Sequence, residues 1–188
     1  MRDWEERFAS LLIEQLCAKR RGKVKKIWFV GRTDIRVGGW WCYLYRGIDE
    51  DGNLVDVRLS KKRDMEAAKA FFAQAYEIAE QAPERVATDG HTSYPRAIEE
   101  ELGEGVEHEG RDCRGNPIEQ SHRGIKQRHY PTLGLRAFES AQRFCSAYDE
   151  GRNFIRPQRY MTEVVSLSEK RELFLERVDE LQLIFQAA

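Results

Sequence analysis

The sequence predicts an α/β domain with a mixed five-stranded sheet, in which three antiparallel strands come first and helices flank the sheet. Three consecutive stretches, 27–37, 40–49 and 54–60, are rich in Val, Ile, Trp and Tyr, as strands are. Gly38-Gly39 and Asp51-Gly52-Asn53 separate them, and both are turn signals because Gly and Asn adopt positive φ at little cost. Helical periodicity then alternates with two short strand-like stretches, which is typical of an α/β fold.

The remaining elements follow from apolar spacing and from boundary residues. An amphipathic helix is expected at 3–20, before the first strand, because apolar side chains recur there at helical spacing. Asp64 can cap the next helix, which Pro83 ends. The expected order is then a strand at 85–89, a helix at 94–102, a strand at 106–108, and helices at 117–128, 138–157 and from 166 onward. This order is similar to that of a ribonuclease H-like domain of the retroviral integrase type.

The length of 188 residues favours one domain with modest appendages. We expect an N-terminal helix and basic linker at 1–25, the α/β domain at 26–157 and a helical extension at 158–188. The formal net charge of −1 gives no general preference for nucleic acid, so any case for DNA depends on local clusters. Basic residues do cluster, at 19–26 and at 111–136, although a solvated face is the simpler interpretation of each run taken alone.

Cysteine spacing and hydropathy exclude several classes. The four cysteines are scattered and have no zinc-site spacing, so we expect reduced thiols. The first residues lack the apolar stretch of a signal peptide, and no run approaches the ~20 apolar residues of a membrane span. The expectation is a soluble cytoplasmic protein without a membrane partner.

Two carboxylates are candidates for metal chemistry. Phosphodiester cleavage in such folds uses carboxylates that hold two divalent cations, so the acids must meet at strand ends or a helix start. Asp89 closes a short strand, and Glu119 lies in the first turn of a helix that also carries Arg123 and Lys126. The alternatives are a turn-forming role for Asp89 before Gly90 and a favourable charge at a helix N-terminus for Glu119.

Three blocks of the sequence resemble one family. They are KIWFVGRTDIRVGGWWCYLYRGIDEDGNLVDVRLSKKRD at 26–64, VATDGHTSYPRAI at 86–98 and GNPIEQSHRGIKQRHYPTLGLRAFESAQRF at 115–144. In this order they resemble the catalytic, integrase-core-like domain of DDE transposases of the insertion-sequence-six type. The resemblance implies a transposase of bacterial or archaeal mobile DNA that cuts and joins strands with Mg²⁺ or Mn²⁺.

The resemblance also assigns roles to residues. Asp89 falls on the family's second catalytic, metal-binding acid and Glu119 on its third. Basic residues on either side of that glutamate are expected to contact DNA phosphates; they are Arg114, Arg123, Lys126 and Arg128.

The first block departs from the family pattern. Where the family has Trp-x-x-Asp-Glu, this chain has Trp28-Phe29-Val30-Gly31-Arg32, so Gly31 replaces the first catalytic acid. That acid typically bridges both metal ions, and we expect catalysis to be impaired without it. Asp34 lies three residues on, and an odd offset in a regular strand points to the opposite face. Asp49 and Asp56 are more simply surface or turn residues.

Three functional hypotheses stay open at this point. The first is a degenerate transposase that keeps weak DNA contact, and the second is a working transposase whose metal site is completed by Asp34 or another ligand. The third is a non-catalytic module that binds through its terminal helices and modulates an intact relative, with self-association also expected. The family's N-terminal helix-turn-helix region is not evident before the first block, where only the helix at 3–20 is expected.

Overall fold

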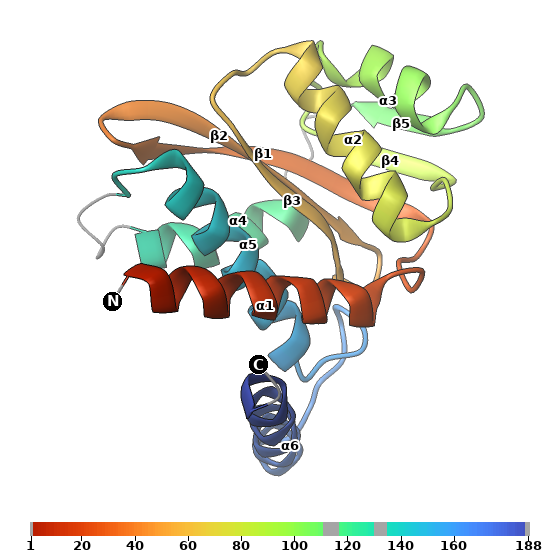
Figure 1. The fold of residues 1–188 in the computed structure, drawn as a ribbon. Helices are drawn as coiled ribbons and strands as arrows, with labels where there is room; N and C mark the ends of the chain where they lie inside the picture. Colours follow the sequence, from red (N-terminus) through yellow and green to blue (C-terminus); the bar gives the residue numbers. More distant parts are fainter. Residues whose placement is uncertain (1, 111–116, 130–134, 187–188) are drawn as a thin grey trace.

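A computed structural model describes residues 2–110, 117–129 and 135–186 and shows a sheet covered by helices on both faces (Figure 1). In chain order the elements are α1 Arg2–Arg20, β1 Ile27–Val37, β2 Trp40–Asp49, β3 Leu54–Ser60, α2 Met65–Ala79, β4 Arg85–Thr88, α3 Tyr94–Leu102, β5 Glu107–Gly110, α4 Pro117–His129, α5 Phe138–Ile155 and α6 Leu167–Gln186. Within the described part of the chain, no helix is both long and apolar enough to span a membrane.

The sheet has five strands in the order β3-β2-β1-β4-β5. β1 pairs with β2, and β2 with β3, in antiparallel fashion, whereas β4 runs parallel to both β1 and β5. The long β1–β2 hairpin turns at Gly38 and Gly39, which both have positive φ. The mixed five-stranded sheet and its initial antiparallel meander, predicted from the sequence, are therefore confirmed.

One core lies between the sheet and the helices α2 and α3. Its largest side chains are fully buried aromatic residues from the central strands and both helices: Trp28, Tyr45, Phe71, Phe72 and Tyr94. Asp64 caps α2 as predicted, since its carboxylate accepts a hydrogen bond from the Ala67 N–H at 3.0 Å. Every second residue of β1 near its start, Trp28 and Val30, faces this core.

A second core lies on the opposite face, against α4 and α5. It joins the apolar residues at the far end of β1, Ile35 and Val37, to Ile125 of α4 and to Ala141 and Cys145 of α5. Alternation along β1 thus divides its side chains between two cores. One set of β1 side chains faces α2 and α3, and the other faces α4 and α5. Only the second set can reach a site beside α4.

The terminal helices differ in how they attach. α1 packs along α5 and ends in the buried residue Arg20, whereas α6 has no buried residue in its described length and projects at the periphery of the molecule (Figure 1). α6 begins with the predicted capping box, in which Ser166 N–H donates to Glu169 Oε2 at 3.0 Å and Glu169 N–H donates to Ser166 Oγ at 3.3 Å.

Candidate functional site

Gly31 lies in the middle of β1, and its empty Cβ direction points at α4. A Cβ atom added there would lie 2.9 Å from Cγ2 of Ile118 and 3.0 Å from Cε1 of His122. Both neighbours are almost fully buried. Because interiors are close-packed, the approach of α4 to β1 depends on the missing side chain. A methyl group of Ile118 and the imidazole of His122 therefore occupy the space that the side chain of the family's first catalytic acid would need.

Asp89 follows the last residue of β4 and is exposed. The parallel pairing of β1 and β4 brings Phe29 beside Ala87, and continuing that register by two residues carries Asp89 to the level of Gly31. Its Oδ1 accepts a hydrogen bond from the His91 N–H at 3.2 Å, and Gly90 between them has a φ of +77°. Asp89 therefore takes part in a turn, which is the alternative role that the sequence suggested for it.

α4 carries the other candidate residues. Glu119 lies in its first turn, and Arg123 and Lys126 follow at helical spacings of four and seven, so their Cα atoms lie on one side of the helix. Arg123 and Arg128 are exposed, and the Arg128 guanidinium lies 5.2 Å from the centre of the Tyr148 ring. Arg114 lies outside the described residues.

His122 occupies the buried side of the same helix. Burial, followed by the positive charges of Arg46 and Lys126, lowers the pKa of His122 to about 3. The imidazole is therefore neutral at physiological pH. His122 was not among the candidates predicted from the sequence, although its place four residues after Ile118 and three before Ile125 matches the helical period of an apolar face.

Arg32, which replaces the family's second acidic residue of the first block, points away from Gly31. Its guanidinium lies 5.9 Å from the centre of the Tyr43 ring, on the face of the sheet that α2 and α3 cover. Burial and then the positive charges of Arg32 and Arg63 lower the pKa of His91, while Asp89 acts in the opposite direction. The loop after β4 thus lies in a positive local field.

Asp34 does not reach the place of the missing acid. β1 pairs with β2 in unbroken register from Trp28 to Val37, so no bulge turns Asp34 toward the face that Gly31 presents to α4. Asp34 is exposed on the opposite face. The second hypothesis therefore loses its named replacement ligand.

Asp49 and Asp56 were expected to be surface or turn residues; both are buried, so a surface position is wrong for both, whereas the turn role is correct for Asp49. Asp49 has no exposed surface and accepts hydrogen bonds from the N–H groups of Asp51 and Asn53, so it does stabilise the turn. Asp56 is 2% exposed and lies 3.4 Å from the Arg20 guanidinium. Burial raises the pKa of Asp56 to about 7, although Arg20 lowers it. Both carboxylates are engaged in contacts that stabilise the fold.

Two buried ion pairs tie α5 to the rest of the domain. Arg20 of α1 donates to both carboxylate oxygens of Glu150 at 2.9 Å, and Arg46 of β2 donates to Asp149 at 2.8 Å. Burial raises the pKa of Asp149, while Arg46 lowers it. Sequence reasoning placed Arg20 in a solvated basic run and overlooked the two acids, because charge patterning does not show which partners a fold brings together.

The described side chains do not by themselves form a two-metal site. Among the residues whose side chains the structure describes, no group of three or more His, Cys, Asp and Glu could hold a metal ion. Asp89 is one carboxylate, and the side chain of Glu119 lies outside that description. At the position of the first acid, the neighbouring atoms are a methyl group of Ile118 and a carbon of His122. The described side chains thus supply one carboxylate there, that of Asp89, and two divalent cations need more negative charge than one carboxylate provides.

Solved structures with the same fold are integrase cores. The chain is similar to a chain of a simian T-cell lymphotropic virus intasome complexed with the PP2A regulatory subunit B56 gamma, with 12% identity and a TM-score of 0.51 over 82% of this chain and 56% of that chain. It is also similar to the HTLV-2 integrase catalytic core domain in complex with magnesium, with 14% identity and a TM-score of 0.50 over 82% of this chain and 99% of that one. At these identities the likeness establishes the ribonuclease H-like, retroviral integrase-type fold.

Sequence comparison then identifies the family. The sequence model described as the DDE domain, of the IS240 transposase type, matches residues 25–158. The chain is 33% identical over 129 residues to the Staphylococcus aureus transposases for insertion sequence-like element IS431mec and for insertion sequence element IS257 in transposon Tn4003. Each alignment covers 66% of this chain and 57% of the relative. The chain belongs to the DDE transposases of the insertion-sequence-six type.

A further relative is the uncharacterized protein pYV0051 of Yersinia pseudotuberculosis. It is 36% identical over 80 residues, which are 42% of this chain and 75% of that protein. With 57% of their length aligned, the chain spans little more than half of the Staphylococcus aureus transposases that it matches.

Proposed function

We propose that this chain is a transposase-family protein whose metal-dependent DNA cleavage and strand transfer are impaired. The observation that carries the proposal is Gly31, whose Cβ direction is filled by Ile118 and His122. Asp89 and Glu119 are the proposed remaining acids. Among the described side chains only the Asp89 carboxylate is available at this site, which is too little negative charge for two metal ions. The proposed domain spans 26–157, with appendages at 1–25 and 158–188.

Restoring the acid tests this proposal. The parent chain should neither bind Mn²⁺ at this site nor join a donor DNA end to a target. Gly31→Asp with Arg32→Glu restores the family pattern, and Ile118→Ala makes room for the new carboxylate beside α4. We expect metal binding, measured by calorimetry, to increase in the triple variant above both the parent and Ile118→Ala alone. Strand transfer by the parent chain itself would overturn the proposal.

DNA contact is proposed for the exposed side of α4. Arg123 and Arg128 are exposed cations on this helix, and Lys126 is half-buried beside them. Replacing all three by Gln should weaken binding of a duplex and reduce the salt dependence of the binding constant, because fewer counterions are released. The matched control replaces three exposed lysines outside α4 by Gln, namely Lys25, Lys62 and Lys170. Equal DNA affinity in both variants would refute the assignment of the contact to α4.

A second candidate function is modulation of an intact relative through the terminal helices. It is favoured by the exposed apolar side chains of α6, among which Phe174, Leu175 and Leu183 are 48%, 56% and 64% exposed. Light scattering on the chain alone, and co-purification with a full-length relative, test it. Monomers in the first measurement together with no retention in the second would argue strongly against it.

A further inference from the structure

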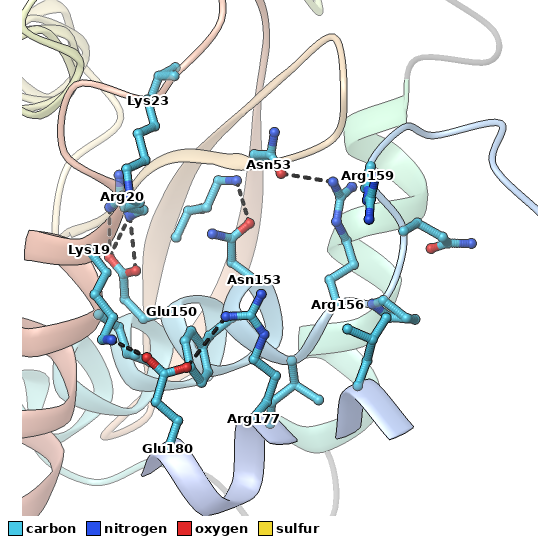
Figure 2. Close-up of a pocket in the computed structure, with 18 residues that line it drawn as sticks. Lys19, Arg20, Lys23, Asn53, Glu150, Asn153, Arg156, Arg159, Arg177 and Glu180 are labelled. Carbon is cyan, nitrogen blue, oxygen red and sulfur yellow. Dashed lines mark hydrogen bonds and ion pairs between the residues drawn. The ribbon is translucent and has the colours of Figure 1, made fainter. Parts of the chain in front are cut away.

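A pocket of about 630 Å³ opens between the end of α1, the β2–β3 turn, the end of α5 and α6 (Figure 2). Its described lining residues include none from β4 or α4, so it is separate from the site around Gly31 and Asp89. A volume of this size is typical of pockets that hold small organic ligands.

The lining is strongly cationic. Six cationic side chains line the pocket, namely Lys19, Arg20, Lys23, Arg156, Arg159 and Arg177, against the two carboxylates Glu150 and Glu180. Both carboxylates are already engaged. Glu150 binds Arg20 in a buried bidentate pair, and Glu180 binds Lys19 as well as Arg177, the latter at 3.5 Å (Figure 2). The two lining carboxylates, Glu150 and Glu180, therefore balance only part of the positive charge of the six lining cations.

Three of the cations form no side-chain ion pair among the described residues, namely Lys23, Arg156 and Arg159, although the Glu163 carboxylate accepts a hydrogen bond from the Arg159 backbone N–H at 2.5 Å. Arg156 is half-buried, and its guanidinium donates to the Asn53 side-chain oxygen at 2.8 Å. Burial lowers the pKa of Arg156, although Asp49 and Asp51 raise it. Arg159 is exposed and lines the same pocket as Arg156 (Figure 2). The nearby carboxylates of Asp49, Asp51 and Glu163 act on Arg156 without a direct ion pair, and a partly desolvated guanidinium that forms no such pair is stabilised when an anion binds it.

The rest of the lining suits the organic part of a ligand. Leu16, Val24 and Leu54 are buried apolar residues of the pocket wall, and Phe154 adds an aromatic ring. Asn153 uses its side-chain oxygen to accept a hydrogen bond from the Leu54 N–H at 2.9 Å, so its NH₂ group is left as a donor. Apolar walls with a few convergent donors are typical of a ligand site.

We propose that this pocket binds a phosphate-bearing ligand of the nucleotide class, with the phosphate between Arg156 and Arg159 and the base or sugar against the apolar wall. Guanidinium groups bind phosphate oxygens in a two-pronged geometry that lysine cannot reproduce. The nucleotide unit is either free or part of a DNA strand, and the phosphate chemistry is the same in both cases. This proposal does not depend on the proposed function of the DDE site.

Calorimetry of the full chain with deoxyadenosine monophosphate tests the proposal. The parent should bind this nucleotide and bind deoxyadenosine, which lacks the phosphate, much more weakly. Lys23→Gln with Arg159→Gln removes two exposed cations whose loss should leave the fold intact, which thermal melting checks. We expect binding to weaken about tenfold or more, as for the loss of hydrogen bonds to a charged group. Arg156→Lys should weaken it too, although the charge is kept.

The control is the pair Lys62→Gln and Lys170→Gln, which makes the same charge change outside the pocket and should leave nucleotide affinity unchanged. Equal affinity in the pocket variant and the control, or no nucleotide binding by the parent, would overturn the proposal. A labelled short DNA strand separates the two sources. Weaker strand binding in the pocket variant, with competition by the nucleotide, indicates a nucleotide within DNA, and unchanged strand binding with weakened nucleotide binding indicates a free nucleotide. Loss of DNA binding in the α4 variant alone bears only on the proposed function.

Discussion

Gly31 affects both the chemistry and the packing of this protein. The close approach of Ile118 and His122 to its Cα means that α4 lies nearer to β1 than a side chain at position 31 would allow. Loss of the acid and the position of the helix are thus connected. A reversion that restores only the carboxylate meets a steric obstacle, which is why the proposed test includes Ile118→Ala.

The contact between Gly31 and α4 predicts a specific energetic coupling. Gly31→Ala should lower the free energy of unfolding by about 1–3 kcal/mol, since the new methyl group overpacks the interface. Ile118→Ala lowers it through a cavity, and in the double variant the methyl group partly fills that cavity. The loss in the double variant should then be smaller than the sum of the single losses by more than ~0.5 kcal/mol in urea unfolding. Gly105→Ala, with no atom within 4 Å of the added Cβ, is the control. Strict additivity would contradict the close contact.

His122 predicts a pH dependence of stability. Its pKa is about 3 in the folded protein, against an ordinary value of 6.5, so the unfolded chain binds more protons between these values. The stabilisation is complete above about pH 6.5 and is lost as the pH falls toward 3. The free energy of unfolding should therefore decrease less between pH 7 and pH 5 in His122→Gln than in the parent. Parallel pH profiles for the two proteins would rule out this role of the imidazole.

Among the elements, α1 and α6 illustrate two kinds of attachment. α1 contributes Arg20 to a buried, bidentate pair with Glu150, and the Arg20 Nη1 group also donates to the Val55 carbonyl at 2.7 Å. α6 is held by contacts among partly exposed side chains, including those of Phe185 and Phe8, whose rings are tilted by 57° with centres 5.5 Å apart. The N-terminal helix is therefore packed into the domain, although the family match begins only at residue 25.

The Arg20–Glu150 pair predicts a large effect of one substitution. Arg20→Met removes one partner and leaves a buried carboxylate unpaired, which should reduce the free energy of unfolding by about 3–5 kcal/mol. Lys19→Met is the matched control, because it breaks an exposed pair with Glu180 on the neighbouring residue and should cost less than ~1 kcal/mol. Denaturant unfolding of both variants measures the difference. A similar loss of unfolding free energy in the two variants would show that the buried Arg20–Glu150 pair contributes no more to stability than the exposed Lys19–Glu180 pair.

At the scale of the whole molecule, the two cores and the sheet form one unit to which α6 is added. β1 carries side chains into both cores, so opening either core disturbs the central strand. α6 buries no residue in its described length, and its main contacts with other elements are those with α5 and α1. Its local opening should require much less free energy than opening of the sheet.

Native-state hydrogen exchange tests this hierarchy. Amides of β1 and β2 should exchange only through global unfolding, and those near the end of α1 should be protected similarly because Arg20 is buried. Amides of α6 should exchange through a smaller, separate opening. Exchange of α6 together with the sheet, in one cooperative step, would disprove the proposed separation of residues 158–188 from the domain.

Most of the architecture could be predicted from the sequence, because strand and helix periods, turn residues and caps are local signals. The β1–β2–β3 meander, the Asp64 cap and the Ser166 capping box are examples, and three blocks of residues also indicated the family. The partners of buried charges could not be predicted. Asp56 looked like a surface residue, and Arg20 like part of a solvated run, until the fold brought α1, β3 and α5 together.

Gly31 shows most clearly what the sequence determines and what depends on the tertiary structure. The sequence by itself determined that the first acid of a DDE transposase is missing and that an odd offset directs Asp34 to the other face. Only the tertiary structure decided what occupies the missing acid's place, because Ile118 and His122 come from a helix more than 80 residues later in the chain. The same holds for the cationic pocket, whose charges come from α1, α6 and the segment after α5. Contacts distant in sequence depend on packing, and no local pattern encodes them.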